Sequence, residues 1–208
     1  MVKKIIEKSK KDFLTYAKYK KQLEKNPKVV SSIGSARIES GDSEIWWDVH
    51  HLGYLLGKKG YSVLSGGGGG LMRSIDDGVM KGGGTSVGLK MDLEVDKKGG
   101  HAVNTIPIDC RYFFTRKYML YRDAKALIGL PGGFGTLDEL FEFITLVQTK
   151  KMSNKPIILF DPNLDFWQPL ISVIEKVLKN YKTGFFKEVD ISLARTPEEV
   201  LKLLTKIK

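Results

Sequence analysis

The sequence predicts an α/β fold of the Rossmann-like type, in which a doubly wound parallel sheet carries helices on both faces. Short apolar segments rich in β-branched residues alternate along the chain with longer segments of helical periodicity. The apolar segments lack a regular in-and-out alternation, which is typical of strands buried on both faces. Three of them run directly into turns of glycine and other small residues. Ligands of such folds bind beyond the carboxyl ends of the strands, so these turns are the first candidates for a site.

Several segments have the composition of buried strands, being short, apolar and bounded by turn-forming or charged residues. They span 29–34, 61–65, 85–91, 125–130, 155–160 and 190–195. The stretch from 92 to about 109 is less regular. Within it we expect a turn at 96–100 and extended chain over 101–108, without assigning a further strand.

The segments between these strands have the periodicity of helices. We expect helices over 43–60, 71–84, 111–124, 136–151, 166–181 and 196–207. Ser43 is the expected cap of the first of these helices, and Gly60 is its expected end. Thr196 followed by Pro197 is a clear start for the last one.

A further helix is expected before the first strand, over 3–24, and "NPK" ends it. Its outer face is charged, and we expect its inward side chains to be Ile6, Phe13, Tyr16, Ala17 and Leu23. The sequence contains no internal repeat, linker or low-complexity tract. We therefore expect one domain over 1–208, with 1–25 as an N-terminal helical extension.

Composition narrows the classes of function. The net charge is +10, but only six of the 34 basic residues are Arg and the Lys are scattered, so nucleic-acid binding is not favoured over a basic, solvated surface. Cys110 is the one cysteine, which predicts a reducing, cytoplasmic setting without disulfides. We expect neither a signal peptide nor a membrane span. His50, His51 and His101 do not form a metal-binding spacing with Cys110 or nearby carboxylates, so no metal site is predicted.

Three glycine-rich loops follow strands, at 33–37, 65–72 and 130–136. If the strands are parallel, all three lie at one edge of the sheet. Glycines allow close approach of the backbone, and the N–H groups at a helix start favour an anion. None of the loops matches the dinucleotide fingerprint or a phosphate-binding P-loop. The arrangement predicts a nucleotide or sugar-phosphate pocket, and the alternative is a set of tight turns.

Thr136 and Glu139 have two interpretations. The spacing T-x-x-E is that of a capping box, in which Thr136 caps a helix and Glu139 reaches back to its N–H. However, Glu139 is in line with Phe143 and Leu146 along the helix, which predicts a partly buried carboxylate. Burial would raise its pKa and suit it to acid–base chemistry.

Arg116 is unusual in a similar way. Its neighbours at helical spacing include Tyr112, Phe113, Met119 and Leu120, so a cation lies among apolar side chains and needs a partner. It is either a snorkelling side chain, a member of a structural ion pair, or a pocket group that faces a substrate.

These residues together resemble those of a known family. "PGGFGTLDE", residues 131–139, resembles the P-G-G-x-G-T-x-x-E motif of the LOG family of phosphoribohydrolases, which are often labelled lysine decarboxylases. "FFTRKYML" resembles the Arg-Lys-x-x-Met helix of that family. "SGGGGGLM" and "SIGSAR" resemble its glycine loop and its first strand and loop. The resemblance covers roughly 28–160.

The resemblance implies hydrolysis of the N-glycosidic bond of a nucleoside 5′-monophosphate, such as a cytokinin riboside monophosphate or AMP, to a free base and ribose 5-phosphate. This chemistry requires no metal or redox cofactor. The resemblance also implies a homodimer or higher homo-oligomer. Arg116 and Glu139 would be the catalytic pair. The residues carried over as substrate-binding are Gly34, Ser35, Gly68, Gly69, Lys117, Gly132, Gly133, Gly135 and Thr136.

Two segments depart from the smaller members of that family. Residues 88–104 replace an expected stretch containing Asn and Pro, which points to a different base preference. The N-terminal helix and "FWQPL" resemble the larger bacterial subgroup. A non-catalytic carrier of a nucleotide or of molybdenum cofactor is the alternative with the same fold. No Lys is singled out for the pyridoxal phosphate that a decarboxylase would need.

Overall fold

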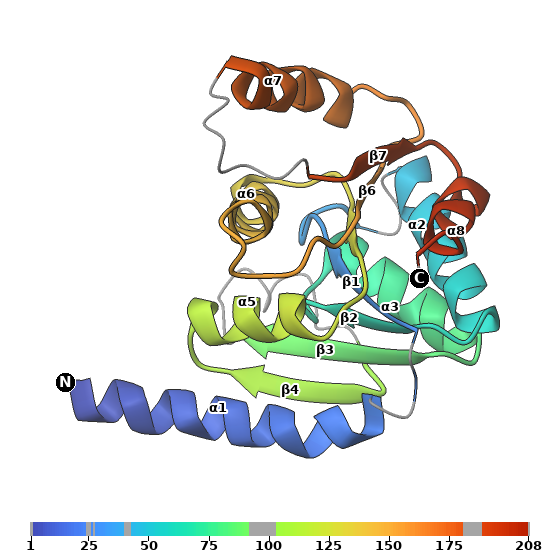
Figure 1. Cartoon of the computed structure of the whole chain (residues 1–208). Coiled ribbons are helices and arrows are strands. Elements are labelled where there is room, and N and C mark those ends of the chain that lie inside the picture. Colours follow the sequence, from blue (N-terminus) through green and yellow to red (C-terminus); the bar gives the residue numbers. More distant parts are fainter. Residues whose placement is uncertain are drawn as a thin grey trace.

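The computed structural model describes residues 2–23, 26, 28–39, 43–91, 103–180 and 189–207. Its centre is a parallel sheet with strand order β4-β3-β2-β1-β5-β6-β7 (Figure 1). All of its strand pairs are parallel. The strands are β1 Val29–Ile33, β2 Ser62–Ser65, β3 Thr85–Met91, β4 Ile106–Cys110, β5 Leu127–Gly129, β6 Ile157–Phe160 and β7 Ile191–Ala194.

Helices cover both faces of the sheet, which confirms the doubly wound Rossmann-like fold. The helices are α1 Val2–Leu23, α2 Glu44–Lys58, α3 Gly70–Lys81, α5 Phe113–Arg122, α6 Phe134–Gln148, α7 Trp167–Asn180 and α8 Pro197–Leu204. One buried cluster joins side chains of α1, α5, α6 and α7 to the sheet. A second cluster joins α2, α3 and α8 to the opposite face. The two apolar clusters account for the continuous apolar runs of the central strands.

β4 is a strand that the sequence pattern did not assign. It pairs with β3 alone at the edge of the sheet. Its burial alternates, because Pro107 and Asp109 are exposed between buried residues. Proline is tolerated on an edge strand, and these two residues interrupt the apolar run that marks the other strands. The turn expected at 96–100 lies outside the described residues.

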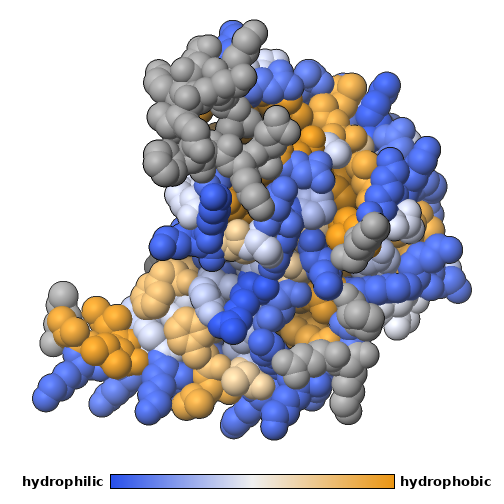
Figure 2. Space-filling view, in the orientation of Figure 1, coloured by the Kyte–Doolittle hydropathy of each residue, from blue (hydrophilic) through white to orange (hydrophobic). Residues whose placement is uncertain are grey.

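α1 forms as expected, but its buried face is rotated from the expected one. Ile6 is 60% exposed and Ala17 is also exposed, so both predictions were wrong, whereas Tyr16 and Leu23 are buried and Phe13 is half-buried. Polar contacts of this helix, described below, set its orientation in place of a continuous apolar stripe. Its N-terminal end extends beyond the sheet, and Figure 2 shows apolar side chains exposed over that end of the molecule.

The helix boundaries mostly follow the predicted signals. Thr196 caps α8, since its hydroxyl oxygen accepts a hydrogen bond from the Glu199 N–H at 3.2 Å. Gly60 follows α2 with a φ of +75°, a conformation that favours glycine. Ser43 precedes α2, but its side chain makes no capping hydrogen bond.

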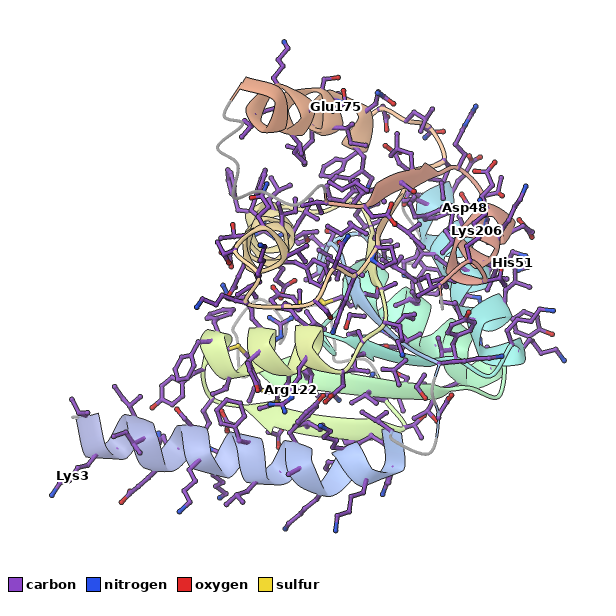
Figure 3. The ribbon with its side chains drawn as sticks, in the orientation of Figure 1. Lys3, Asp48, His51, Arg122, Glu175 and Lys206 are labelled. Carbon is purple, nitrogen blue, oxygen red and sulfur yellow. The ribbon has the colours of Figure 1, made fainter. Side chains whose placement is uncertain are left out.

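Charged side chains cover the outside of the molecule. Lys3 on α1 points away from the body of the protein (Figure 3), and Glu175 on α7 is exposed. No helix in the part of the chain that the structure describes is long and apolar enough to be a membrane span.

Candidate active site

The glycine loops meet where the strand order reverses. β1 lies between β2 and β5, so the chain leaves β1 in one direction across the sheet and later returns to its other side at β5. The Ser35 N–H donates to the Pro131 carbonyl at 3.0 Å, and the Ser35 carbonyl accepts from the Leu71 N–H at 2.8 Å. Ser35 therefore joins the loops after β1, β2 and β5. This is the switch point at which such sheets bind ligands.

A pocket of about 630 Å³ lies at this point. Its walls come from the loops after β1 and β2, the end of β3, the starts of α3, α5 and α6, and the segment before α7. The lining residues are Gly34, Ser35, Ala36, Arg37, Gly66, Met72, Met91, Phe113, Arg116, Gly132, Gly133, Phe134, Gly135, Thr136, Leu137, Asp138, Glu139 and Phe166.

The start of α6 forms one wall of the pocket. The N-cap is Gly133, and no side chain caps the helix. Thr136 is the third helical residue and is buried, so the capping-box interpretation of Thr136 and Glu139 was wrong. The other interpretation, a buried Glu139 carboxylate, is confirmed. The N–H groups of the first turn have no acceptor within the helix, and they can bind an anion in the pocket. Any side chain larger than glycine at 132 would clash with the Thr136 hydroxyl.

The loop after β2 has a different part in the site. Gly66 lines the pocket, whereas Gly68 and Gly69 do not. The N–H of Leu71, near the start of α3, is already bonded to Ser35. Gly70 has a φ of +61° and packs against the backbone of the loop after β1. This loop thus supports the pocket from behind, and the α6 loop offers the free amides.

Arg116 and Glu139 face one another in the pocket. Arg116 Nη1 lies 3.4 Å from Glu139 Oε1, and the two side chains are only 10% and 9% exposed. Arg116 Nε has no hydrogen-bond partner. Burial raises the pKa of Glu139, and the positive charge of Arg116 opposes that rise. Arg116 thus has the partner that its apolar surroundings require, and one of its donors stays available.

Contacts between α5 and α6 hold this pair in place. The Tyr121 hydroxyl donates to the Glu139 carbonyl at 3.0 Å. Lys117 Nζ lies 3.1 Å from Asp138 Oδ2 and 2.5 Å from Glu142 Oε2. Burial lowers the pKa of Lys117, but its bonds to these two carboxylates outweigh that effect and raise it overall. Lys117 does not line the pocket and connects the two helices instead.

Known proteins resemble both the sequence and the structure. The model of the family described as "Possible lysine decarboxylase" matches residues 72–207. A rice protein named probable cytokinin riboside 5′-monophosphate phosphoribohydrolase LOGL2 is 32% identical over 79% of this chain and 67% of its own length. The rice protein LOG, named for the same activity, is 35% identical over 73% of this chain and 63% of its own. The chain belongs to the LOG family.

The LOG relatives include proteins from outside rice. One from Rhodococcoides fascians, named cytokinin riboside 5′-monophosphate phosphoribohydrolase, is 31% identical over 51% of this chain and 53% of its own length. The chain spans about half to two thirds of these three relatives. Among solved structures, the structural-genomics target TM1055 is 27% identical, with a TM-score of 0.64 over 86% of this chain and 99% of that one.

More distant structures share the fold alone. The molybdenum cofactor binding protein of Rippkaea orientalis is 21% identical, with a TM-score of 0.60 over 86% of this chain and 94% of its own. DNA processing protein A of Helicobacter pylori is 16% identical, with a TM-score of 0.57 over 89% of this chain and 83% of its own. Likeness at this level shows that this fold is shared by proteins of different kinds.

Some pocket residues were not predicted from the LOG resemblance. Arg37 lies three residues after Gly34 in the "SIGSAR" segment and adds a second cation to the pocket. Phe166 reaches it from the segment before α7, and Phe134 is 91% exposed at the start of α6. Arg37 was within reach of sequence reasoning, because it is the last residue of the first glycine-rich loop, 33–37. Phe166 has no such signal, since only the packing of α7 brings it there.

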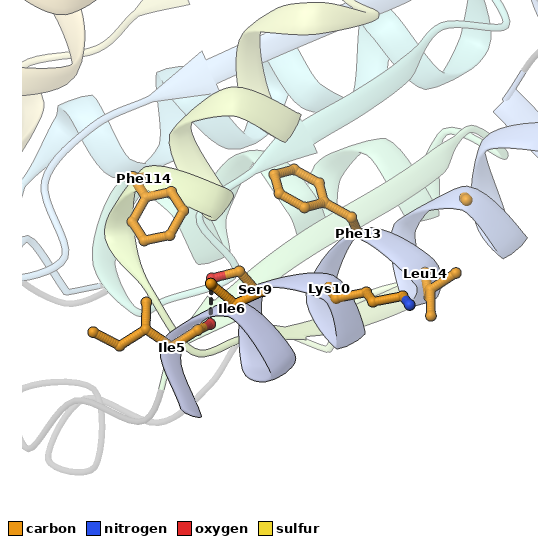
Figure 4. Close-up of a pocket in the computed structure, with 8 residues that line it drawn as sticks. Ile5, Ile6, Ser9, Lys10, Phe13, Leu14 and Phe114 are labelled. Atoms are coloured by element: carbon orange, nitrogen blue, oxygen red, sulfur yellow. Dashed lines mark hydrogen bonds between the residues drawn. The ribbon is translucent and has the colours of Figure 1, made fainter. Parts of the chain in front are cut away.

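A second hollow, of about 660 Å³, lies between α1 and the start of α5 (Figure 4). Its lining is mostly apolar, with side chains such as Ile5, Phe13 and Phe114, and Lys10 is its one charged residue. It lacks the backbone amides and the buried charges of the switch-point pocket. The switch-point pocket is therefore the candidate site for an anionic substrate.

Proposed function

We propose that this protein is a phosphoribohydrolase that cleaves the N-glycosidic bond of nucleoside 5′-monophosphates, including AMP or a cytokinin riboside monophosphate. Water would add to C1′ of the ribose, and the base would leave with a proton, giving free base and ribose 5-phosphate. The buried Arg116–Glu139 pair beside the uncapped start of α6 is the observation that carries this proposal. The names of the LOG relatives support it.

The substrate phosphate would bind at the start of α6. Amides of Gly133 to Thr136 and the partial positive charge of the helix end would hold its oxygens. The cation of Arg37 lies in the same pocket and would add a charged contact. Glu139 follows Thr136 by three residues, or about 4.5 Å along a helix, so the sugar would extend from the phosphate toward the carboxylate.

Glu139 would act on the sugar. Cleavage of a ribosyl C–N bond builds positive charge at C1′, as in glycoside hydrolysis. A buried carboxylate can stabilise this charge, and it can also take a proton from the attacking water. The positive charge of Arg116 would favour the ionised form of Glu139, whereas burial raises the pKa of this carboxyl. The unpaired Nε of Arg116 can donate to the substrate.

The described residues that line the pocket include no lysine, so they supply no amine for a pyridoxal phosphate linkage. This observation weighs against the decarboxylase reading of the family description.

Release of free base tests the proposal. The purified protein is incubated with AMP and with cytokinin riboside monophosphates, and the free base is measured by chromatography. Glu139→Gln and Arg116→Ala should each lower turnover by at least about 100-fold. Glu175→Gln, a matched change at an exposed position of α7, should leave it unaltered. Adenosine should be a poor substrate, because it lacks the phosphate. Absence of release from every monophosphate by folded protein would contradict the proposal.

The wild type and the Glu139→Gln variant also distinguish a hydrolase from a non-catalytic carrier. A carrier would retain a nucleotide or cofactor tightly and stoichiometrically, and Glu139→Gln would not alter that retention. Mass spectrometry of the purified protein would identify such a ligand.

Assembly as a homodimer or higher homo-oligomer is also part of the proposal. Three aromatic side chains on α5 are each about half exposed: Phe113, Phe114 and Tyr118. Exposed apolar side chains that lie close together favour contact with a protein partner over contact with water. Light scattering that gives a monomer mass would reject this. We further propose a cytoplasmic setting, because Cys110 is the one cysteine of the sequence and is a free thiol.

A further inference from the structure

α1 is hydrogen-bonded to the start of α5, the helix that carries Arg116. Asp12 on α1 is fully buried. Its Oδ2 accepts from the Arg111 N–H and from the Thr115 hydroxyl, both at 2.9 Å, and its Oδ1 accepts from Arg111 Nη1 at 2.6 Å. Thr115 itself is fully buried and directly precedes Arg116. One carboxylate from the extension thus binds both the backbone and the side chains at the start of α5.

A second contact fastens α1 to the end of the same helix. The Tyr16 hydroxyl donates to Asp123 Oδ2 at 2.6 Å and also lies 3.3 Å from the Met119 carbonyl. Lys20 Nζ forms an ion pair with Asp123 Oδ1 at 3.3 Å. Asp123 directly follows the last residue of α5. α1 therefore holds α5 at both of its ends.

These contacts are directional, and they do not simply bury apolar surface. Ser9, Asp12, Tyr16 and Leu23 are the buried residues of α1, whereas Ile6 and Leu14 are more than half exposed. A buried carboxylate is unfavourable unless its oxygens are hydrogen-bonded. Hydrogen bonds at fixed positions define the rotation and the height of one helix against another more closely than apolar contacts do.

The position of α5 matters because Arg116 has little room. Its guanidinium packs so closely on Gly66 that a Cβ there would overlap Nη2, and its Nη1 faces Glu139 at 3.4 Å. A small displacement of α5 would break one of these contacts. Resting on the function proposed above, we propose that α1 is a positioning element for that site. Asp12 and Tyr16 are the positioning residues that set Arg116 relative to Glu139.

Steady-state kinetics on AMP test this inference. Asp12→Asn and the milder Thr115→Val should lower kcat about 10- to 100-fold, with KM changed less than about three-fold, because a misplaced catalytic group loses mainly transition-state stabilisation. Thr15→Val is the matched control, since the Thr15 hydroxyl bonds only within α1, to the Lys11 carbonyl at 3.0 Å. Equal losses in Thr15→Val and Thr115→Val would overturn the inference.

A double-mutant cycle identifies the route of the effect. If Asp12 acts through Arg116, Asp12→Asn should change kcat far less in an Arg116→Lys background than in the wild type. Effects that multiply fully would show that Asp12 acts in another way and would overturn the inference.

Hydrogen exchange keeps the inference separate from the proposed reaction. Asp12→Asn and Tyr16→Phe should speed amide exchange across 113–122, with little change in α8, on the opposite face of the sheet. If the wild type cleaves no monophosphate, the proposed function fails, and exchange still decides whether α1 holds α5. Unaltered exchange in 113–122 for both variants would overturn the positioning role.

Discussion

Asp76 lies behind the glycine loop that supports Arg116, and its ionisation should make the stability of the protein depend on pH. It belongs to α3 and is fully buried. Its carboxylate accepts from the Ser65 hydroxyl at 2.6 Å, the Ser86 hydroxyl at 2.8 Å and Asn104 Nδ2 at 2.8 Å. Burial raises its pKa to about 6, although these bonds act in the opposite direction. Ser65 Oγ also accepts from the Gly67 N–H at 3.0 Å, which connects Asp76 to the loop.

The size of the effect follows from this pKa. In the unfolded chain the pKa of an Asp is about 3.9. Its difference from the folded-state pKa of about 6 corresponds to about 3 kcal/mol in the free energy of unfolding. Between these two values the folded state binds more protons than the unfolded state, and the free energy of unfolding therefore falls as pH rises. Below about pH 3.9 the carboxyl is neutral in both states, and above about pH 6 the folded protein carries the full penalty.

Chemical denaturation of the wild type and of Asp76→Asn between pH 3.5 and pH 7.5, spanning the window of about 3.9 to 6, isolates the contribution. Subtracting the two curves cancels most other titrating groups. The wild type should lose about 3 kcal/mol relative to the variant across this range. Glu175→Gln, on the exposed surface of α7, should run parallel to the wild type. A difference that is flat, or that grows in favour of the wild type as pH rises, would refute the reasoning.

Three further changes probe the pocket and the contact between α5 and α6. Gly66→Ala places a Cβ against Arg116 Nη2 and 2.6 Å from the Met72 sulfur, which should displace Arg116. AMP turnover should therefore fall at least about 10-fold, while circular dichroism shows that the variant is folded. Arg37→Ala should raise KM for AMP more than it lowers kcat, and an unchanged KM would remove Arg37 from the phosphate site. Tyr121→Phe removes the hydrogen bond to the Glu139 carbonyl and should lower the free energy of unfolding, measured in urea, by about 1 kcal/mol. A free energy of unfolding equal to that of the wild type would show that this hydrogen bond contributes nothing to stability.

The fold and the meeting of the loops could be predicted because they depend on patterns along the chain. Buried parallel strands carry continuous apolar runs, and the order of strands and helices fixes which ends share an edge. The pattern marked Arg116 and Glu139 separately, each as a charged residue among apolar neighbours of a helix, and such a charge requires a partner. The LOG resemblance named the two as a pair, and the structure places their side chains 3.4 Å apart.

The errors arose where a local pattern competes with packing. The T-x-x-E spacing fits a capping box, but α6 begins earlier, at Phe134, because Gly133 provides the N-cap without a side chain. The apolar residue Ile6 was expected to face inward, but the polar anchors Asp12 and Tyr16 orient α1 differently. Sequence periodicity registers hydrophobicity and does not register a buried polar contact between segments a hundred residues apart.

The contacts around α5 explain why the geometry of this site depends on the position of one helix. On one side α6 contributes Glu139, and Tyr121 and Lys117 of α5 bond to α6. Behind it, Gly66 limits where the guanidinium of Arg116 can lie. On the outer side, Asp12 of α1 holds its first turn. The amides that we propose for phosphate binding belong to α6, and Arg116 belongs to α5. The distance between these amides and Arg116 therefore depends on how the two helices pack. Changes at this packing should therefore alter kcat even where they touch no substrate.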